Sequence, residues 1–247
     1  MSRPQVSNPL APGSSPRRFY DAATVARLED GGHGVFLDGR PVRSPSRGVL
    51  ILPSAALAEA VAEEWAAQGD HVDPHSMPLT QLANTALERV AAGRAALLDE
   101  IMTYVDADML CYRADDPPDL ALRQAEAWQP WLDWAEQALA APMAVTVGVM
   151  PLRQPEATAR ALRVALEALD DWAFTGVQCA AGAAGSLVLG LALGHGRLDG
   201  ETCFALSRLD EIYQMERWGE DREALKAREV LRRDILAAER LVRLSRA

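Results

Sequence analysis

The hydrophobic period of this chain changes at Pro53, and that change limits its possible folds more than any other feature. Before Pro53, short apolar runs are separated by turn dipeptides, among them Gly31-Gly32 and Asp38-Gly39. Asp-Gly between apolar runs favours a hairpin, because a type I′ turn needs positive φ at both central residues. After Pro53, apolar residues recur every three or four positions, which is typical of helices. We therefore expect an α+β protein.

The same change predicts the domain organisation. Residues 17–75 should form a small antiparallel β-rich domain with one covering helix, which Ser54 can cap at its start. Residues 76–247 should form a larger multihelical domain. Residues 1–16 carry four prolines and no acidic residue, which predicts a disordered tail.

Two further helices have informative patterns. Between Gln178 and Leu193 we expect one helix with a ridge of small residues four positions apart, namely Gly182, Ser186, Gly190 and Gly194. Such a ridge lets another backbone approach closely, so this helix should lie at the centre of the helical domain. Another helix is expected from Gly200 to Trp218.

Composition argues against several classes of function. The formal net charge is -10, so most of the surface would repel a nucleic-acid backbone. Cys111, Cys179 and Cys203 lie far apart in apolar patterns and are interpreted as buried thiols rather than a disulfide framework. The longest apolar run is shorter than the ~20 residues that span a bilayer, so no membrane insertion is expected.

Candidate metal and catalytic residues are few. His71 and His75 have a chelating spacing, but Pro74 interrupts the helix that would pair them, so no metal site is expected. Asp106 and Asp108 lie close to Asp115 and Asp116, and paired carboxylates can share acid and base roles when one is buried. A small-molecule enzyme using Asp106 and Asp108 is therefore the alternative function.

The segment from Phe204 to Trp218 has two apolar stripes. On one helix, Leu206, Leu209 and Tyr213 would lie nearly opposite a second stripe, formed by Phe204, Arg208, Glu211, Met215 and Trp218. Either the helix is buried on both sides, or one stripe is presented to another protein. Trp and Met beside a carboxylate and an Arg are typical of interfaces.

Four stretches, in order along the chain, resemble one family. They are Arg18-Phe-Tyr with Leu37-Asp-Gly-Arg-Pro41, Met77-Pro-Leu-Thr-Gln-Leu-Ala-Asn-Thr-Ala86, Asp108-Met-Leu-Cys-Tyr-Arg-Ala114, and Leu209-Asp-Glu-Ile-Tyr-Gln-Met-Glu-Arg-Trp-Gly-Glu-Asp221. The last closely resembles the C-terminal signature of the ATP-twelve family, the assembly chaperones for the alpha subunit of ATP synthase.

The resemblance implies a β-rich domain followed by a helical one, with no catalysis and no cofactor. It implies that the free ATP synthase alpha subunit is held transiently until a beta subunit replaces the chaperone, and that an acidic position in the signature matters. Glu211 and Glu216 match that position, and Glu211 is favoured. The expected partner-binding residues are Arg208, Glu211, Gln214, Met215, Glu216 and Trp218. The chain lacks a convincing transit peptide, so a bacterial cytoplasmic protein is expected. We also expect a monomer.

Overall fold

The structure is a computed structural model that describes residues 16–29, 31–219 and 222–247. The predicted disordered tail at residues 1–16 lies outside these residues, apart from Pro16. Packing divides the chain into two compact units: residues 1–89 with 243–247, and residues 90–242. These two units are defined by packing, which does not test which segments fold independently. The expected domain boundary between residues 75 and 76 therefore stays a prediction. The α+β class is confirmed.

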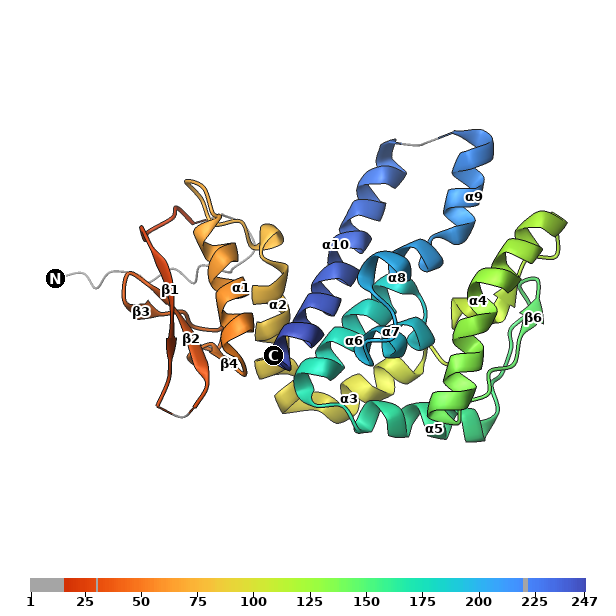
Figure 1. Cartoon of the computed structure of the whole chain (residues 1–247), viewed down its shortest axis with the longest axis horizontal. Helices are drawn as coiled ribbons and strands as arrows, with labels where there is room; N and C mark the ends of the chain where they lie inside the picture. The colour runs from red at the N-terminus through yellow and green to blue at the C-terminus, as the bar shows by residue number, and fades with distance from the viewer. Residues whose placement is uncertain (1–15, 30, 220–221) are drawn as a thin grey trace. The chain divides into compact units, whose positions relative to one another are not determined.

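The first unit contains a small antiparallel sheet (Figure 1). β2 (His33–Leu37) pairs with β1 (Ala23–Arg27), with β3 (Arg40–Pro41) and with β4 (Ile51–Leu52). Asp38 and Gly39 connect β2 to β3 with φ of 47° and 79°, which confirms the predicted turn with positive φ at both central residues.

Helix α1 (Ala55–Ala66) covers this sheet, and Ser54 caps its start, as predicted. The Ser54 hydroxyl accepts a hydrogen bond from the Leu57 backbone N–H at 3.0 Å, which satisfies one otherwise unpaired helix-end donor. On its buried face Leu57, Val61 and Trp65 are at most 5% exposed. The unit also contains a 3-10 turn (Pro74–Ser76), α2 (Pro78–Asn84) and the start of a π-helical segment (Thr85–Val90).

The second unit is mainly helical. Its elements are α3 (Ala91–Met102), a 3-10 turn (Met109–Cys111), β5 (Tyr112–Arg113), α4 (Pro118–Leu139), β6 (Thr146–Val147), α5 (Glu156–Glu167), α6 (Asp171–Ala184), α7 (Leu187–Gly194), α8 (Gly200–Ser207), α9 (Leu209–Trp218) and α10 (Arg222–Ser245). The last residues of α10 belong to the first unit. Among the described helices, none is long and apolar enough to cross a membrane.

The predicted single helix from Gln178 to Leu193 is wrong, because the chain reverses within it. Gly185 adopts a left-handed conformation (φ 72°) that ends α6, and the Ser186 side chain then caps α7. The expected ridge of four small residues is therefore divided between two helices. Close approach of backbones occurs instead between α6 and α7, where a Cβ on Gly190 would lie 3.0 Å from the Val177 carbonyl oxygen.

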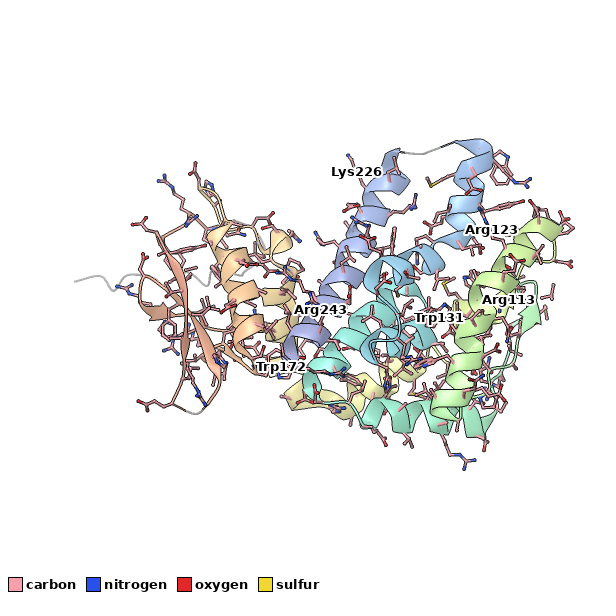
Figure 2. All side chains as sticks on the ribbon, viewed as in Figure 1. Arg113, Arg123, Trp131, Trp172, Lys226 and Arg243 are labelled. Carbon is pink, nitrogen blue, oxygen red and sulfur yellow. The ribbon has the colours of Figure 1, made fainter. Side chains whose placement is uncertain are left out.

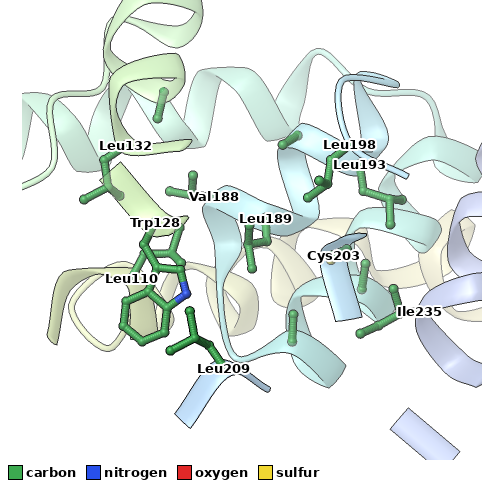
Figure 3. Close-up of a cluster of buried hydrophobic side chains, with 14 of the residues drawn as sticks. Leu110, Trp128, Leu132, Val188, Leu189, Leu193, Leu198, Cys203, Leu209 and Ile235 are labelled. Carbon is green, nitrogen blue, oxygen red and sulfur yellow. The ribbon is translucent and has the colours of Figure 1, made fainter. Parts of the chain in front are cut away.

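Helix α7 lies at the centre of the second unit, and all eight of its residues are buried. Val188 and Leu189 pack in one apolar cluster with Trp128 and Leu132 of α4 (Figure 3). Leu187 and Leu191 belong to a second cluster, to which α3, α5 and α6 contribute. The expectation that this apolar segment forms the centre of the helical part is confirmed.

The three cysteines are free thiols. Cys111 and Cys203 are buried and Cys179 is partly buried, which agrees with their interpretation as small apolar residues. Burial raises the pKa of each thiol to about 12.

The glycines of α6 and α7 give a test of this packing. A Cβ at Gly190 would lie 2.9 Å from the Ala181 Cβ and 3.0 Å from two backbone atoms, whereas one at Gly182 would meet only the Tyr104 hydroxyl, at 3.8 Å. Gly190→Ala should therefore lower the free energy of unfolding by about 1–3 kcal/mol through overcrowding. Gly182→Ala should leave it unchanged or raise it by up to ~1 kcal/mol through helix propensity. Urea unfolding measures both, and equal effects would contradict this packing.

Candidate functional site

The predicted partner-binding residues lie on α9 and at its N-cap, Arg208. The predicted helix from Gly200 to Trp218 is wrong in one respect: it is interrupted at Arg208, whose backbone (φ −111°, ψ 16°) leaves the helical conformation. The Arg208 guanidinium donates hydrogen bonds to the carbonyl oxygens of Ala183 and Ala184 at 3.2 and 3.4 Å. These carbonyls end α6, so Arg208 satisfies acceptors that a helix end leaves unpaired.

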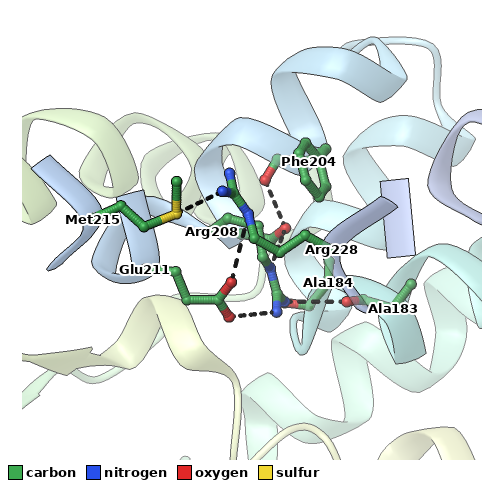
Figure 4. Close-up of polar contacts among 8 residues, drawn as sticks. Ala183, Ala184, Phe204, Arg208, Glu211, Met215 and Arg228 are labelled. Atoms are coloured by element: carbon green, nitrogen blue, oxygen red, sulfur yellow. Dashed lines mark hydrogen bonds and ion pairs between the residues drawn. The ribbon is translucent and has the colours of Figure 1, made fainter. Parts of the chain in front are cut away.

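Glu211 lies between two arginines (Figure 4). Its carboxylate accepts a hydrogen bond from Arg208 at 2.9 Å and forms an ion pair with Arg228 of α10 at 3.8 Å. Both arginine side chains are at least four-fifths buried, whereas the Glu211 side chain is 44% exposed. Arg228 also contacts the Met215 sulfur and lies over the Phe204 ring. Glu211 and Met215 thus join α9 to α10, and Arg208 joins the start of α9 to the end of α6.

A second set of polar contacts joins α9 to α4. Glu216 accepts two hydrogen bonds from Arg123 at 2.8 and 3.1 Å, and Figure 2 shows Arg123 on the part of α4 nearest to α9. The bonds from Arg123 lower the pKa of the Glu216 carboxyl. Asp119, one turn earlier on α4, accepts a hydrogen bond from the Tyr213 hydroxyl at 2.8 Å and pairs with Arg217.

The structure places five of the six predicted residues on α9 and the sixth, Arg208, at its N-cap, but they do not share one face. Arg208, Glu211 and Met215 contact α10 or α6, and Glu216 contacts α4. Gln214 is exposed, and Trp218, the last residue of α9, is 75% exposed. Glu216 is also exposed but pairs with Arg123, so Trp218 and Gln214 are the exposed members of the set that are not engaged in these ion pairs.

Sequence reasoning missed the partners that hold this helix. Asp119, Arg123 and Arg228 pair with α9 across 13 to 98 residues of chain. A local signal exists only for Asp119 and Arg123, whose spacing of four places both on one face of α4. Their pairing with α9 depends on how the helices pack, and no local pattern contains that information.

Asp106 and Asp108, the alternative catalytic carboxylates, both accept hydrogen bonds from backbone N–H groups. Asp108 is fully buried, and its two oxygens accept hydrogen bonds from the Leu110 and Val188 backbone N–H groups at 3.1 and 3.0 Å. Asp106 accepts a hydrogen bond from the Gln154 N–H. An open cavity of about 390 Å³ lies among α3, α6 and α10, and neither Asp106 nor Asp108 lines it. Asp108 therefore serves chiefly to cap the N-terminus of α7 and to fix the turn before β5.

Asp108 predicts a pH dependence of folding stability. Burial raises the pKa of its carboxyl from 3.8 to about 6, so the folded chain holds this proton more tightly than the unfolded chain. The resulting stabilisation is complete below about pH 4 and is lost as the pH rises through about 6, an effect of roughly 3 kcal/mol.

The measurement is urea unfolding of wild type and Asp108→Asn between about pH 4 and 7. The asparagine does not titrate, so the wild type should lose stability relative to the variant as the pH rises. Parallel stability curves over that range would contradict the raised pKa.

Residues 17–136 match the family model described as ATP12 chaperone protein. The chain is 26% identical over 227 residues to "Protein atp12, mitochondrial" of Schizosaccharomyces pombe, a match that covers 87% of this chain and 77% of the relative.

Two solved structures extend the match to nearly the whole chain. Atp12 from Paracoccus denitrificans is 42% identical, with a TM-score of 0.86, over 93% of this chain and 98% of that one. A protein from Agrobacterium tumefaciens is 40% identical, with a TM-score of 0.87, over 93% of this chain and 86% of that one. Because identity at this level extends through both the sheet and the helices, this chain belongs to the ATP12 chaperone family.

Proposed function

We propose that this chain binds the free alpha subunit of ATP synthase, covers the surface that later meets a beta subunit, and releases it when a beta subunit takes its place. The observation that carries the proposal is the match to Atp12 from Paracoccus denitrificans along 93% of this chain. The family is one of chaperones, and the four stretches described above resemble the chaperones of the alpha subunit. A free subunit exposes apolar surface that aggregates unless it is covered.

The end of α9 is the proposed contact surface for the client. Trp218 offers a large apolar side chain that is 75% exposed, and Gln214 lies one turn before it. The ion pairs of Glu216 with Arg123 and of Arg217 with Asp119 form a polar surround. An aromatic anchor within a polar rim gives specific binding without a large permanent apolar interface, which suits a transient partner.

Glu211 is proposed as the acidic residue that matters for client binding. Two arginines hold its carboxylate, yet 44% of the side chain remains exposed. A cation on the client can therefore approach a carboxylate whose position is already fixed, which reduces the entropy lost on binding. The internal ion pairs with Arg208 and Arg228 also give Glu211 a role in holding α9 against α10.

The proposal includes no catalytic step. Asp108, the one strongly perturbed carboxyl among the described residues, is fully buried and uses both oxygens to accept backbone hydrogen bonds. Catalytic carboxyl groups usually line clefts that a substrate can enter, and a fully buried carboxyl does not fit that pattern. We propose that the chain acts in a bacterial cytoplasm, a proposal that its similarity to proteins of Paracoccus denitrificans and Agrobacterium tumefaciens supports. We also propose that it acts as a monomer.

The experiment is a pull-down with purified components. The tagged full chain should retain isolated alpha subunit and release it when beta subunit is added. Failure to retain alpha subunit under conditions that keep both proteins folded would refute the proposal. Continued retention in the assembled ATP synthase would instead indicate a permanent subunit.

Trp218→Ala separates client binding from stability. The side chain is mostly exposed, so its removal should change the free energy of unfolding by no more than about 0.5 kcal/mol. If Trp218 anchors the client, the Kd for alpha subunit should rise by about 30-fold, the size of a typical hot-spot loss. The matched control is Val164→Ala on α5, which removes an apolar side chain that is 64% exposed and should leave the Kd unchanged.

Glu211→Lys tests the acidic position. The substitution places a third cation beside Arg208 and Arg228, so a client cation should be repelled and retention of alpha subunit should fall by at least about tenfold. Circular dichroism and a thermal melt establish that the variant is folded. A folded Glu211→Lys protein that retains alpha subunit as well as wild type shows that the assigned role is wrong.

A further inference from the structure

The open cavity among α3, α6 and α10 has a lining that combines apolar and acidic side chains. Ile101, Ala183 and Leu231 supply apolar surface, and Glu100 and Asp234 supply two carboxylates. Its volume of about 390 Å³ falls within the range of roughly 300–1,000 Å³ that is typical of ligand sites. An apolar cavity with a few polar groups directed into it is the usual form of such a site.

Gly182 keeps the cavity open on the side of α6. A Cβ at this residue would meet only the Tyr104 hydroxyl, at 3.8 Å. Gly182 lies within α6 and is not one of the glycines with positive φ, so its backbone conformation does not require a glycine. The space beside Gly182 is therefore large enough to admit a side chain from elsewhere.

Three polar side chains of the lining have no internal partner. The Glu100 carboxylate, the Gln178 amide and the Tyr104 hydroxyl form no hydrogen bond or ion pair with any residue that the structure describes. Asp234 differs, because it pairs with Arg233 at 3.2 Å. Polar groups at a cavity that lack internal partners bind water or a ligand, and here the unpaired charge is negative.

The lining favours one class of occupant. Its carboxylates repel anions, and no group of three metal-ligating side chains occurs in the described part of the chain. A purely apolar group would take Glu100 and Asp234 out of water without a partner, which is costly. A lysine or arginine side chain fits both parts of the lining, because its aliphatic stem packs on apolar surface while its charged end reaches a carboxylate.

The cavity adjoins the acidic residue proposed for client binding. Ala183 lines the cavity, and its carbonyl oxygen accepts the hydrogen bond from Arg208 at 3.2 Å. Arg208 in turn pairs with Glu211. On α10, Leu231 of the cavity follows by one turn Arg228, the second arginine that pairs with Glu211. A client polypeptide bound at Glu211 would therefore have the cavity within reach.

We propose that this cavity binds a lysine or arginine side chain of the client polypeptide. The aliphatic part of that side chain packs on Ile101 and Leu231, and its charged group bonds to the carboxylates of Glu100 and Asp234. This inference rests on the proposed function, and it adds a specificity-determining contact to the surface at the end of α9.

Filling the cavity from its own wall is the first test. Gly182→Leu places a side chain in the space that the client cation would occupy, so the Kd for isolated ATP synthase alpha subunit should rise by at least about tenfold. Gly182→Ala is the matched control: it adds only the Cβ, leaves the cavity open, and should keep the wild-type Kd. Circular dichroism and urea unfolding establish that both variants are folded.

Removing the unpaired charge is the second test, and it does not depend on the fold of Gly182→Leu. Glu100→Gln keeps the shape of an exposed side chain and should raise the Kd for alpha subunit by about tenfold at about 0.05 M salt. The difference from wild type should shrink at about 0.5 M salt, because salt screens the attraction between charges. Glu136→Gln on α4, also exposed, is the control and should leave the Kd unchanged.

Cys179 reports on the cavity directly. It lines the cavity and is partly buried, whereas Cys111 and Cys203 are buried elsewhere. Bound alpha subunit should slow alkylation of Cys179 by iodoacetamide at about pH 9 by at least about tenfold, followed by mass spectrometry. Cys111 and Cys203 are internal controls. An unchanged rate at Cys179 in a complex that has formed would overturn the inference.

The outcomes distinguish the two proposals. If wild type does not retain alpha subunit, the proposed function fails and this site fails with it. If Gly182→Leu and Glu100→Gln bind with the wild-type Kd, the site is wrong and the proposed function stands. Loss of binding in Gly182→Leu alone would show that the occupant is not a cation. A dimer of this chain that is lost in Gly182→Leu would show that a second copy supplies the side chain, and either result also overturns the inference.

Discussion

The helical unit depends on the burial of α7, a helix that has no polar face. Its eight residues are all buried and none is charged. Such a helix is stable only when other elements surround it, and α4, α6 and α8 all contact it. Its first turn is held by two side chains, because the Ser186 hydroxyl accepts the Leu189 N–H and Asp108 accepts the Val188 N–H. Gly190 then allows α6 to approach at backbone distance.

Local chemistry made part of the fold predictable. The Ser54 cap and the Asp38-Gly39 turn each depend only on residues that are close in the sequence. The start of α1 and the hairpin could therefore be located from the sequence alone. The breaks at Gly185 and Arg208 could not. A glycine tolerates both a helical and a left-handed conformation, and Arg208 leaves the helix while its guanidinium binds carbonyls more than twenty residues earlier in the chain.

At the candidate site, too, interactions between residues close in the sequence could be predicted, whereas those between distant residues could not. The polar residues of α9 could be identified from the sequence, because the interface-like composition and the family resemblance both lie within one short segment. The sequence could not show that Glu211 lies between Arg208 and Arg228, or that Glu216 pairs with Arg123.

The burial of the three cysteines has a practical consequence for spectroscopy. A thiol whose pKa is raised to about 12 is almost entirely protonated near neutral pH, and the protonated form is a poor nucleophile. Thiol-reactive dyes would therefore attach much faster to a cysteine introduced at an exposed position such as 149 or 218 than to Cys111 or Cys203. Energy transfer from such dyes could follow client capture and release over time, without first removing Cys111 or Cys203.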